Sequence, residues 1–260
     1  MSEIRFDDGA AYERAMGVWS RLAGEVFLDW LQPATGQRWI DVGCGNGAFT
    51  ELLLQRCAPA EVQAIDPSEG QLAFARTRPG ARGAVFLQGD ALALPFEADR
   101  FDAAVMALVI FFVPDPAKGV AEMARVVRPG GEIAAYAWDF ARAGFPYEAI
   151  QDELRAMGRK PPRPPNWQVG SPAGLAALWS GAGLRDVAVR DISVRRHHPS
   201  FEDFWESSLG TSTFASMAAA MPPAELDELR ERLRTRLADA EGRVAYDSLA
   251  AAVRGRVPEG

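Results

Sequence analysis

Strict alternation between strand and helix patterns is the feature that most constrains how this chain of 260 residues can fold. Five short apolar segments, each stopped by a turn signal or a polar residue, follow one another between residues 38 and 138. Helical spacing of apolar residues marks most of the stretches that join them, for example 48–57 and 116–127. The five strands are predicted over 38–42, 61–66, 84–88, 101–109 and 132–138. This alternation predicts a parallel sheet with helices on both faces, in the doubly wound α/β class.

The alternation of strand and helix patterns ends after Asp139. Four prolines between residues 161 and 165 exclude a continuous helix, so residues 140–170 are predicted to be an insert with a stiff extended loop. Ser171 and Pro172 fit the N-cap and first position of a helix that runs through Trp179. Two further strands are predicted over 186–196 and 243–253. A helix over 224–240 precedes the second of them.

Composition excludes several classes of function. The formal net charge of −7 disfavours a general nucleic-acid binder, because such a surface repels phosphates. No apolar run is long enough to span a membrane, and the first eight residues lack an apolar signal core, so we expect a cytoplasmic protein. Cys44 and Cys57 are the only cysteines, and no spacing typical of metal ligands occurs, so no metal site is predicted.

A glycine-rich loop joins the first predicted strand to the first helix. It reads Asp41-Val42-Gly43-Cys44-Gly45-Asn46-Gly47, with glycines at alternate positions. Glycine permits a positive φ and a close approach of a ligand to the backbone, and the next helix points its free N–H groups at that gap. Ligands of such sheets bind at the carboxyl ends of the strands, where Asp41, Asp66 and Asp90 all fall. This coincidence predicts a ligand site at that edge.

The glycines alone leave a nicotinamide-dependent oxidoreductase open, because Gly43, Gly45 and Ala48 satisfy the relaxed dinucleotide pattern. Asp41 disfavours that reading, since its carboxylate stands where a pyrophosphate would lie, whereas a cationic ligand tolerates it better. No Tyr-x-x-x-Lys pair for hydride transfer is evident either. A non-catalytic module that only binds a cofactor is the second alternative.

The chain resembles the class I S-adenosylmethionine-dependent methyltransferases, in the UbiE-like group that acts on small molecules. The glycine-rich loop is the first of a series of motifs that occur in family order over about residues 38 to 139. The later ones are Ala64-Ile65-Asp66-Pro67-Ser68, Gln88-Gly89-Asp90-Ala91, Leu94-Pro95-Phe96-Glu97, Phe101-Asp102-Ala103-Ala104-Val105, Phe111-Phe112-Val113-Pro114-Asp115-Pro116 and Val127-Arg128-Pro129-Gly130-Gly131. Together these motifs are specific, although each one alone is weak.

The resemblance implies a seven-stranded, mostly parallel sheet of order 3-2-1-4-5-7-6, with strand 7 antiparallel. The whole chain, 1–260, would then be a single domain. Residues 1–37 would form an N-terminal cap segment and residues 38–139 the cofactor-binding core. Residues 140–170 and 198–242 would be helical inserts that form a lid near the pocket, and 186–196 and 243–253 the last two strands.

The resemblance also implies S-adenosylmethionine as cofactor and S-adenosylhomocysteine as product. Asp66 would accept hydrogen bonds from the two ribose hydroxyls, and Asp90 from the adenine amino group. Arg21 would meet the methionine carboxylate. The complete set of expected cofactor-binding residues is Gly43, Cys44, Gly45, Asn46, Gly47, Asp66, Pro67, Ser68, Gly89, Asp90, Ala91, Met106, Ala107, Tyr12 and Trp19.

The methyl acceptor is expected to be a small molecule whose nucleophile attacks the methyl group in line with the departing sulfur, and its identity is left open. Candidate acceptor residues are Trp138, Asp139 and His197, with Asp139 either a base or a loop cap. Many relatives carry Leu-His-His where this chain has Ile110-Phe111-Phe112, which implies an apolar wall beside the methyl group. The sequence determines neither whether a general base takes part nor the oligomeric state.

Overall fold

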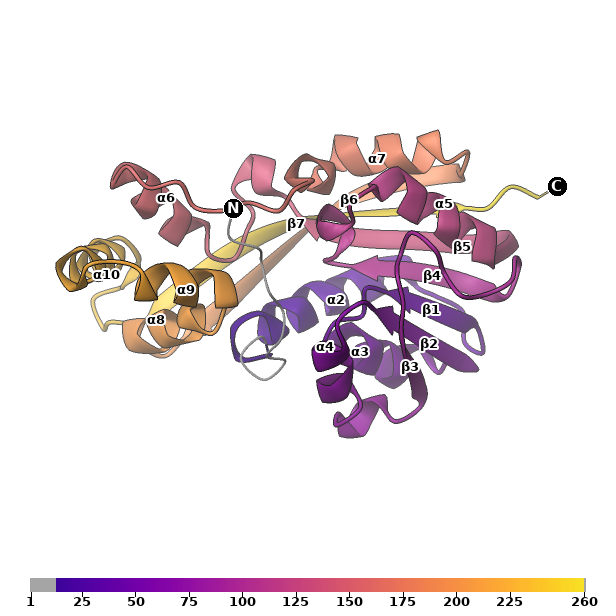
Figure 1. Ribbon diagram of the computed structural model, residues 1–260, viewed down its shortest axis with the longest axis horizontal. Helices are drawn as coiled ribbons and strands as arrows, with labels where there is room; N and C mark the ends of the chain where they lie inside the picture. Colours follow the sequence, from indigo (N-terminus) through magenta and orange to yellow (C-terminus); the bar gives the residue numbers. More distant parts are fainter. Residues whose placement is uncertain (1–12, 260) are drawn as a thin grey trace.

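A computed structural model describes residues 13–259 of the chain. Its seven-stranded sheet has the order β3-β2-β1-β4-β5-β7-β6 (Figure 1). Strands β1 to β5 pair in parallel, whereas β7 runs antiparallel to both β5 and β6. The predicted fold class and strand order are therefore confirmed.

The strands follow the predicted segments closely along the first half of the chain. Their bounds are β1 Arg38–Val42, β2 Glu61–Asp66, β3 Ala84–Gln88, β4 Phe101–Ala107, β5 Val127–Trp138, β6 Arg185–His198 and β7 Val244–Arg256. Trp39 and Ile40 of β1 are fully buried, as are Ala104 and Val105 of β4. Burial on both faces explains why these central strands read as nearly continuous apolar runs.

Helices cover both faces of the sheet (Figure 1). The α-helices are α2 Val18–Leu31, α3 Ala48–Cys57, α4 Glu69–Ala75, α5 Pro116–Val126, α6 Glu148–Ala156, α7 Pro172–Gly181, α8 Phe201–Leu209, α9 Ser212–Ala219 and α10 Pro223–Leu237. Shorter turns are η1 Glu13–Gly17, η2 Pro79–Ala81, η3 Ile110–Phe112, η4 Phe140–Arg142 and η5 Trp167–Gly170. Helices α2 and α3 pack together on one face, and α5 packs with α7 on the other. None of the helices between residues 13 and 259 combines the length and apolar character that a membrane crossing requires.

Among the first five strands, two boundaries differ from the prediction, and β6 and β7 end two and three residues later than predicted. Strand β4 ends at Ala107 and not at Val109, because the backbone of Leu108 turns into the left-handed region (φ 58°) and η3 follows. Strand β5 begins at Val127 and includes the Pro129-Gly130-Gly131 segment that predicted a turn. Gly130 has φ 75° and donates its N–H to Val257 O, so this irregular stretch remains paired with the end of β7. An apolar run by itself shows neither where β4 ends nor where β5 begins.

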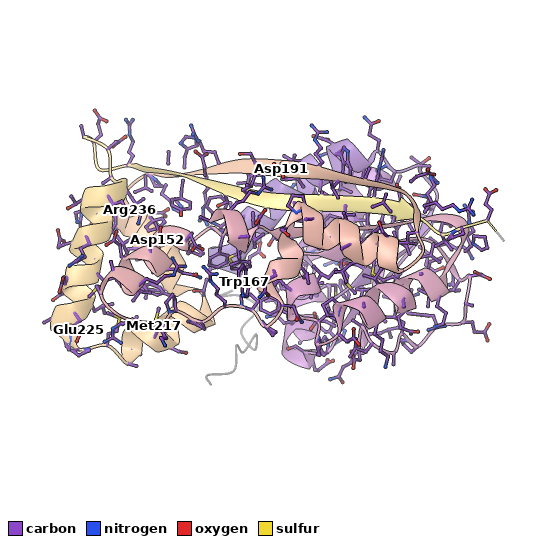
Figure 2. The ribbon with its side chains drawn as sticks, turned by 90° about the horizontal axis from the view of Figure 1, so that it is seen from above. Asp152, Trp167, Asp191, Met217, Glu225 and Arg236 are labelled. Carbon is purple, nitrogen blue, oxygen red and sulfur yellow. The ribbon has the colours of Figure 1, made fainter. Side chains whose placement is uncertain are left out.

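Four helices form a lobe beside the sheet, at the end where β6 and β7 extend beyond the other strands (Figure 1). It consists of α6, α8, α9 and α10, of which only α10 is predicted by the sequence pattern. Figure 2 shows Arg236 of α10 beside Asp152 of α6, to which it donates at 2.9 Å. Arg159 donates to Glu225 in the same lobe. These ion pairs join α6 and the residues just after it to α10, although the partners are 84 and 66 residues apart in the chain.

Candidate active site

The glycine-rich loop turns sharply between β1 and α3. Gly43 has φ 77°, and a Cβ there would lie 2.5 Å from the side chain of Val109, so any larger residue would displace that neighbour. Gly47 has φ 78°, and its Cβ would lie 2.9 Å from Ala75. The N–H groups of Gly43 and Cys44 both donate to Ile65 O, at 2.7 and 3.0 Å. The loop is therefore held tightly against the end of β2, and its glycines are required by geometry.

Asp66 stands at the carboxyl end of β2 and faces the glycine-rich loop. Its two oxygens accept one backbone hydrogen bond each, from Gly45 N–H and from Ser68 N–H, both at 2.9 Å. Burial raises the pKa of Asp66, and the two backbone donors partly offset this. Each carboxylate oxygen can accept a further hydrogen bond, so the side chain retains capacity for two donors from a ligand.

Asp41 is completely buried behind the loop. Its Oδ2 accepts a hydrogen bond from the Thr50 hydroxyl at 2.6 Å, and its Oδ1 has no hydrogen-bond partner among the described residues. Burial raises the pKa of Asp41 to about 7, and the Thr50 hydrogen bond opposes that rise. A buried carboxyl of this kind favours a nearby positive charge.

A cavity, here the glycine-loop cavity, opens between the glycine-rich loop, the end of β2 and the end of β4. Ser20 of α2 and Tyr136 of β5 contribute to its wall, as does Gln71 of α4. The sequence pattern did not single out these three residues, since each lies outside the motifs. Eight predicted residues line the cavity: Gly43, Cys44, Gly45, Asn46, Asp66, Pro67, Ser68 and Ala107.

The N-terminal segment reaches this loop through Glu13 of η1. The Asn46 side-chain amide donates to Glu13 at 2.9 Å, and Arg78 forms an ion pair with the same carboxylate. Arg78 also donates to Asn46 O at 2.6 Å and to Glu51 at 3.0 Å. These half-buried hydrogen bonds and ion pairs therefore hold the start of the described chain against the glycine-rich loop.

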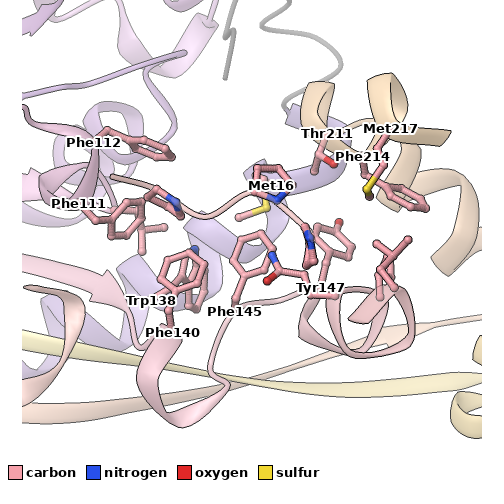
Figure 3. A pocket seen from close by; sticks show the side chains of 17 residues that line it. Met16, Phe111, Phe112, Trp138, Phe140, Phe145, Tyr147, Thr211, Phe214 and Met217 are labelled. Atoms are coloured by element: carbon pink, nitrogen blue, oxygen red, sulfur yellow. The ribbon is translucent and has the colours of Figure 1, made fainter. Parts of the chain in front are cut away.

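A second cavity, here the aromatic cavity, adjoins the first one. Figure 3 shows the rings of Phe111, Trp138, Phe140 and Phe145 on one side of it and Phe214 on the other. Its walls come from η3, from the end of β5, from the segment that follows β5 and from α9. Leu108 and Phe112 line both cavities. A ligand in one cavity would therefore lie next to a ligand in the other.

Comparison with known proteins identifies the family. Residues 40–135 match the family model described as a methyltransferase domain. The chain is 34% identical over 117 residues to the ubiquinone/menaquinone biosynthesis C-methyltransferase UbiE of Roseobacter denitrificans, covering 44% of this chain and 47% of that protein. It is 36% identical over 157 residues to the malonyl-[acyl-carrier protein] O-methyltransferase of Methylococcus capsulatus, covering 60% and 52%. The alignments span about half the length of these relatives.

Residues 40–135 are a methyltransferase domain, similar to the class I S-adenosylmethionine-dependent methyltransferases of the UbiE-like group. The phosphoethanolamine N-methyltransferase 2 of Haemonchus contortus, solved with S-adenosyl-L-methionine, shares the fold. Its TM-score is 0.58 at 18% identity, over 96% of this chain and 56% of that one. The family match ends at residue 135, so it covers most of the glycine-loop cavity and leaves out most of the aromatic cavity.

Three predicted contacts of the methyltransferase lie elsewhere. Met106 is fully buried, and its terminal methyl packs near Gly119 of α5, away from both cavities. Trp19 is fully buried in edge contact with Trp138 at 6.5 Å, so it is a core residue. Arg21 points outward and pairs with Glu25 at 3.2 Å. The common reason is that helix and strand periodicity does not show which side of an element faces a cavity. Tyr12 lies outside the described residues.

The third motif of the methyltransferase lies beside the cavity and does not line it in this structure. Asp90 is exposed and caps its own turn by accepting from Leu92 N–H at 2.9 Å. Gly89 donates its N–H to Asp66 O at 3.1 Å, which places the ends of β2 and β3 together. Ala91 follows in the same turn. Gly47, at the start of α3, supports the loop from behind and does not line the cavity either.

The candidate acceptor residues of the methyltransferase separate into two groups. Trp138 lines the aromatic cavity. Asp139 is fully buried and acts as a loop cap, accepting from the N–H groups of Ala141 and Arg142 and from the Arg142 guanidinium at 2.6 Å. His197 is exposed on β6, opposite Ala245, and lines neither cavity. The geometry therefore brings only Trp138 to the place where an acceptor would lie.

Proposed function

We propose that this protein transfers a methyl group from S-adenosylmethionine to a small-molecule acceptor. The single observation that carries the proposal is the pair of adjoining cavities, with Leu108 and Phe112 in the wall of both. One cavity is built by the motifs of the family, and the other is lined by apolar side chains. A donor in the first and an acceptor in the second would meet at the shared wall.

The residues of the glycine-loop cavity fit this cofactor. Asp66 offers two carboxylate oxygens with spare acceptor capacity, which suits a ribose with two neighbouring hydroxyls. The Gly45 backbone faces open space and leaves room for close approach, and the buried Asp41 carboxyl favours a cation. When bound, S-adenosylmethionine supplies an electrophilic methyl group on a positively charged sulfur.

The role of the protein in such a reaction is to position the reactants and to exclude water. Holding a nucleophile in line with the methyl group can contribute about 7–11 kcal/mol to lowering the barrier. Ala107 and Leu108, at the end of β4, lie at the level where the two cavities meet. The turn at Leu108 is fixed by its N–H, which donates to Tyr136 O at 2.8 Å.

Binding and consumption of the cofactor test this proposal against its two alternatives. Calorimetry with S-adenosylhomocysteine and with NADH should show binding of the first compound only. Incubation with S-adenosylmethionine and a pool of metabolites should yield S-adenosylhomocysteine and a product heavier by one methylene unit. Preferential binding of NADH would support an oxidoreductase. Binding of S-adenosylmethionine without consumption in any pool would support a non-catalytic module.

A further inference from the structure

We propose that the aromatic cavity takes a neutral, apolar aromatic acceptor, namely a phenol whose oxygen receives the methyl group. The proposal rests on the proposed function, because it needs a sulfonium methyl donor in the neighbouring cavity. Most of the walls of the aromatic cavity lie outside residues 40–135. The acceptors of the relatives therefore do not define its occupant, and its chemistry has to come from its own side chains.

The shape of the aromatic cavity suits a flat ring. Phe140 and Phe145 are stacked with their centroids 5.1 Å apart and an interplanar angle of 19°. Phe111 meets Phe140 edge-on at 5.4 Å, and Tyr147 meets Phe145 edge-on at 6.0 Å. Such walls present both faces and edges of rings, which are the two favourable contacts for another aromatic ring. The cavity encloses about 890 Å³ with its open mouth, a size typical of small-molecule sites.

The lining also argues against a charged acceptor. No Asp, Glu, Lys, Arg or His occurs among the described residues that line the aromatic cavity. Three of its polar side chains already have partners: the Tyr147 hydroxyl donates to Ala15 O at 2.8 Å, the Thr211 hydroxyl donates to Ser208 O at 2.9 Å, and Gln151 Oε1 accepts from Arg155 at 3.2 Å. The neutral indole N–H of Trp138 has no hydrogen-bond partner among the described residues. Burial raises the pKa of Tyr147 to about 12, so its hydroxyl stays neutral. An acceptor that arrives with a full charge would lose its water on entry without a protein counter-charge, which is costly, whereas a phenol enters as a neutral molecule.

A phenol is the aromatic acceptor that can react without a base from these walls. It can lose its proton to solvent, and the positive sulfur beyond Leu108 and Phe112 would stabilise the resulting phenolate. An electron pair of the phenolate oxygen then forms a bond to the methyl carbon, and the pair of the carbon–sulfur bond goes to sulfur. The products are an aryl methyl ether and S-adenosylhomocysteine. An aliphatic amine would arrive mostly as ammonium, without a free lone pair and repelled by the sulfonium.

The first test measures binding and needs no turnover. Calorimetry with 2-naphthol, and with naphthalene as an unreactive ring, should show saturable binding to the whole protein. Phe145→Ala should weaken 2-naphthol binding about tenfold, equivalent to about 1.4 kcal/mol, whereas Phe145→Tyr should restore most of the affinity. The matched control is Phe96→Ala, because Phe96 is also half-buried but packs on Phe101 at the opposite end of β4. The control should bind 2-naphthol as the parent protein does.

The second test compares acceptors of equal ring size. With S-adenosylmethionine present, 2-naphthol should be methylated, and the naphthoic acid and aminomethylnaphthalene should not. For substituted naphthols, the pH midpoint of kcat/KM should move with the pKa of each naphthol, because the walls supply no base. A midpoint that stays fixed across the series, a preference for the acid or the amine, or unchanged 2-naphthol binding in Phe145→Ala would overturn the proposal. Failure of S-adenosylhomocysteine binding, with naphthalene still bound, would instead overturn the proposed function.

Discussion

At the residue scale, Asp66 is the side chain on which recognition of the cofactor most depends. Its oxygens are oriented by Gly45 and Ser68, so they are preorganised for further donors. Asp66→Ala is expected to weaken S-adenosylhomocysteine binding by about 1.5–3 kcal/mol, as for hydrogen bonds to a charged group. Calorimetry checks this. Glu69→Ala, an exposed change one turn further on, should leave the affinity unaltered. Equal affinities of parent and Asp66→Ala would contradict the ribose assignment.

Asp41 gives a prediction about pH at the same scale. Its pKa is about 7 when folded and near 4 when unfolded, so the folded state retains the proton more strongly. The stability that this carboxyl contributes is fully present below about pH 4 and is lost as the pH rises through 7, by on the order of 4 kcal/mol.

Asp41→Asn removes this titration. Urea unfolding of both proteins without cofactor, at several pH values, should therefore show the free energy of unfolding of the parent falling relative to the variant between pH 4 and 7. Parallel curves for the two proteins across that range would show that Asp41 does not titrate as proposed.

At the element scale, local signals located several helix starts correctly. Ser68 caps α4 by accepting from Gln71 N–H at 3.4 Å, and Ser171 caps α7 by accepting from Gly174 N–H at 3.1 Å, with Pro172 at the first helical position. These caps were predictable because they depend on residues three apart in the chain. The family resemblance predicted helical inserts over 140–170 and 198–242, but no sequence pattern located α6, α8 and α9 within them. Their apolar faces are short and pack against distant elements.

The cap of α7 can be tested directly, since Ser171 lies in neither cavity. Ser171→Ala should lower the free energy of unfolding by about 1 kcal/mol, because one N–H at the start of α7 loses its acceptor. Urea denaturation measures this. Ser171→Asp, which keeps an acceptor at the N-cap, should recover most of the loss. An equal loss in Ser171→Asp would mean that the side chain acts through something other than capping.

At the scale of the whole molecule, the cofactor should stabilise the fold by binding only its native state. At a ligand concentration one hundred times Kd, the gain is about 2.7 kcal/mol. For a chain of this size that corresponds to a rise in Tm of roughly 5–11 °C. Thermal unfolding with S-adenosylhomocysteine measures it, and Asp66→Ala at the same ligand concentration should show a much smaller rise. Equal shifts in the two proteins would place the ligand away from Asp66.

The sequence alone determined the sheet, its strand order through the family resemblance, and the glycine-rich loop with Asp66. The strands and the glycine-rich loop are encoded by residues close together in the chain, so periodicity and motif spacing are sufficient to find them, whereas the strand order was implied only by the family resemblance. Only the tertiary structure decided where Met106, Trp19 and Asp139 lie. It alone also assembled the aromatic cavity from segments around residues 16, 111, 140 and 214. The physical reason is that an apolar side chain looks the same in the sequence whether it packs against a neighbour or faces a cavity.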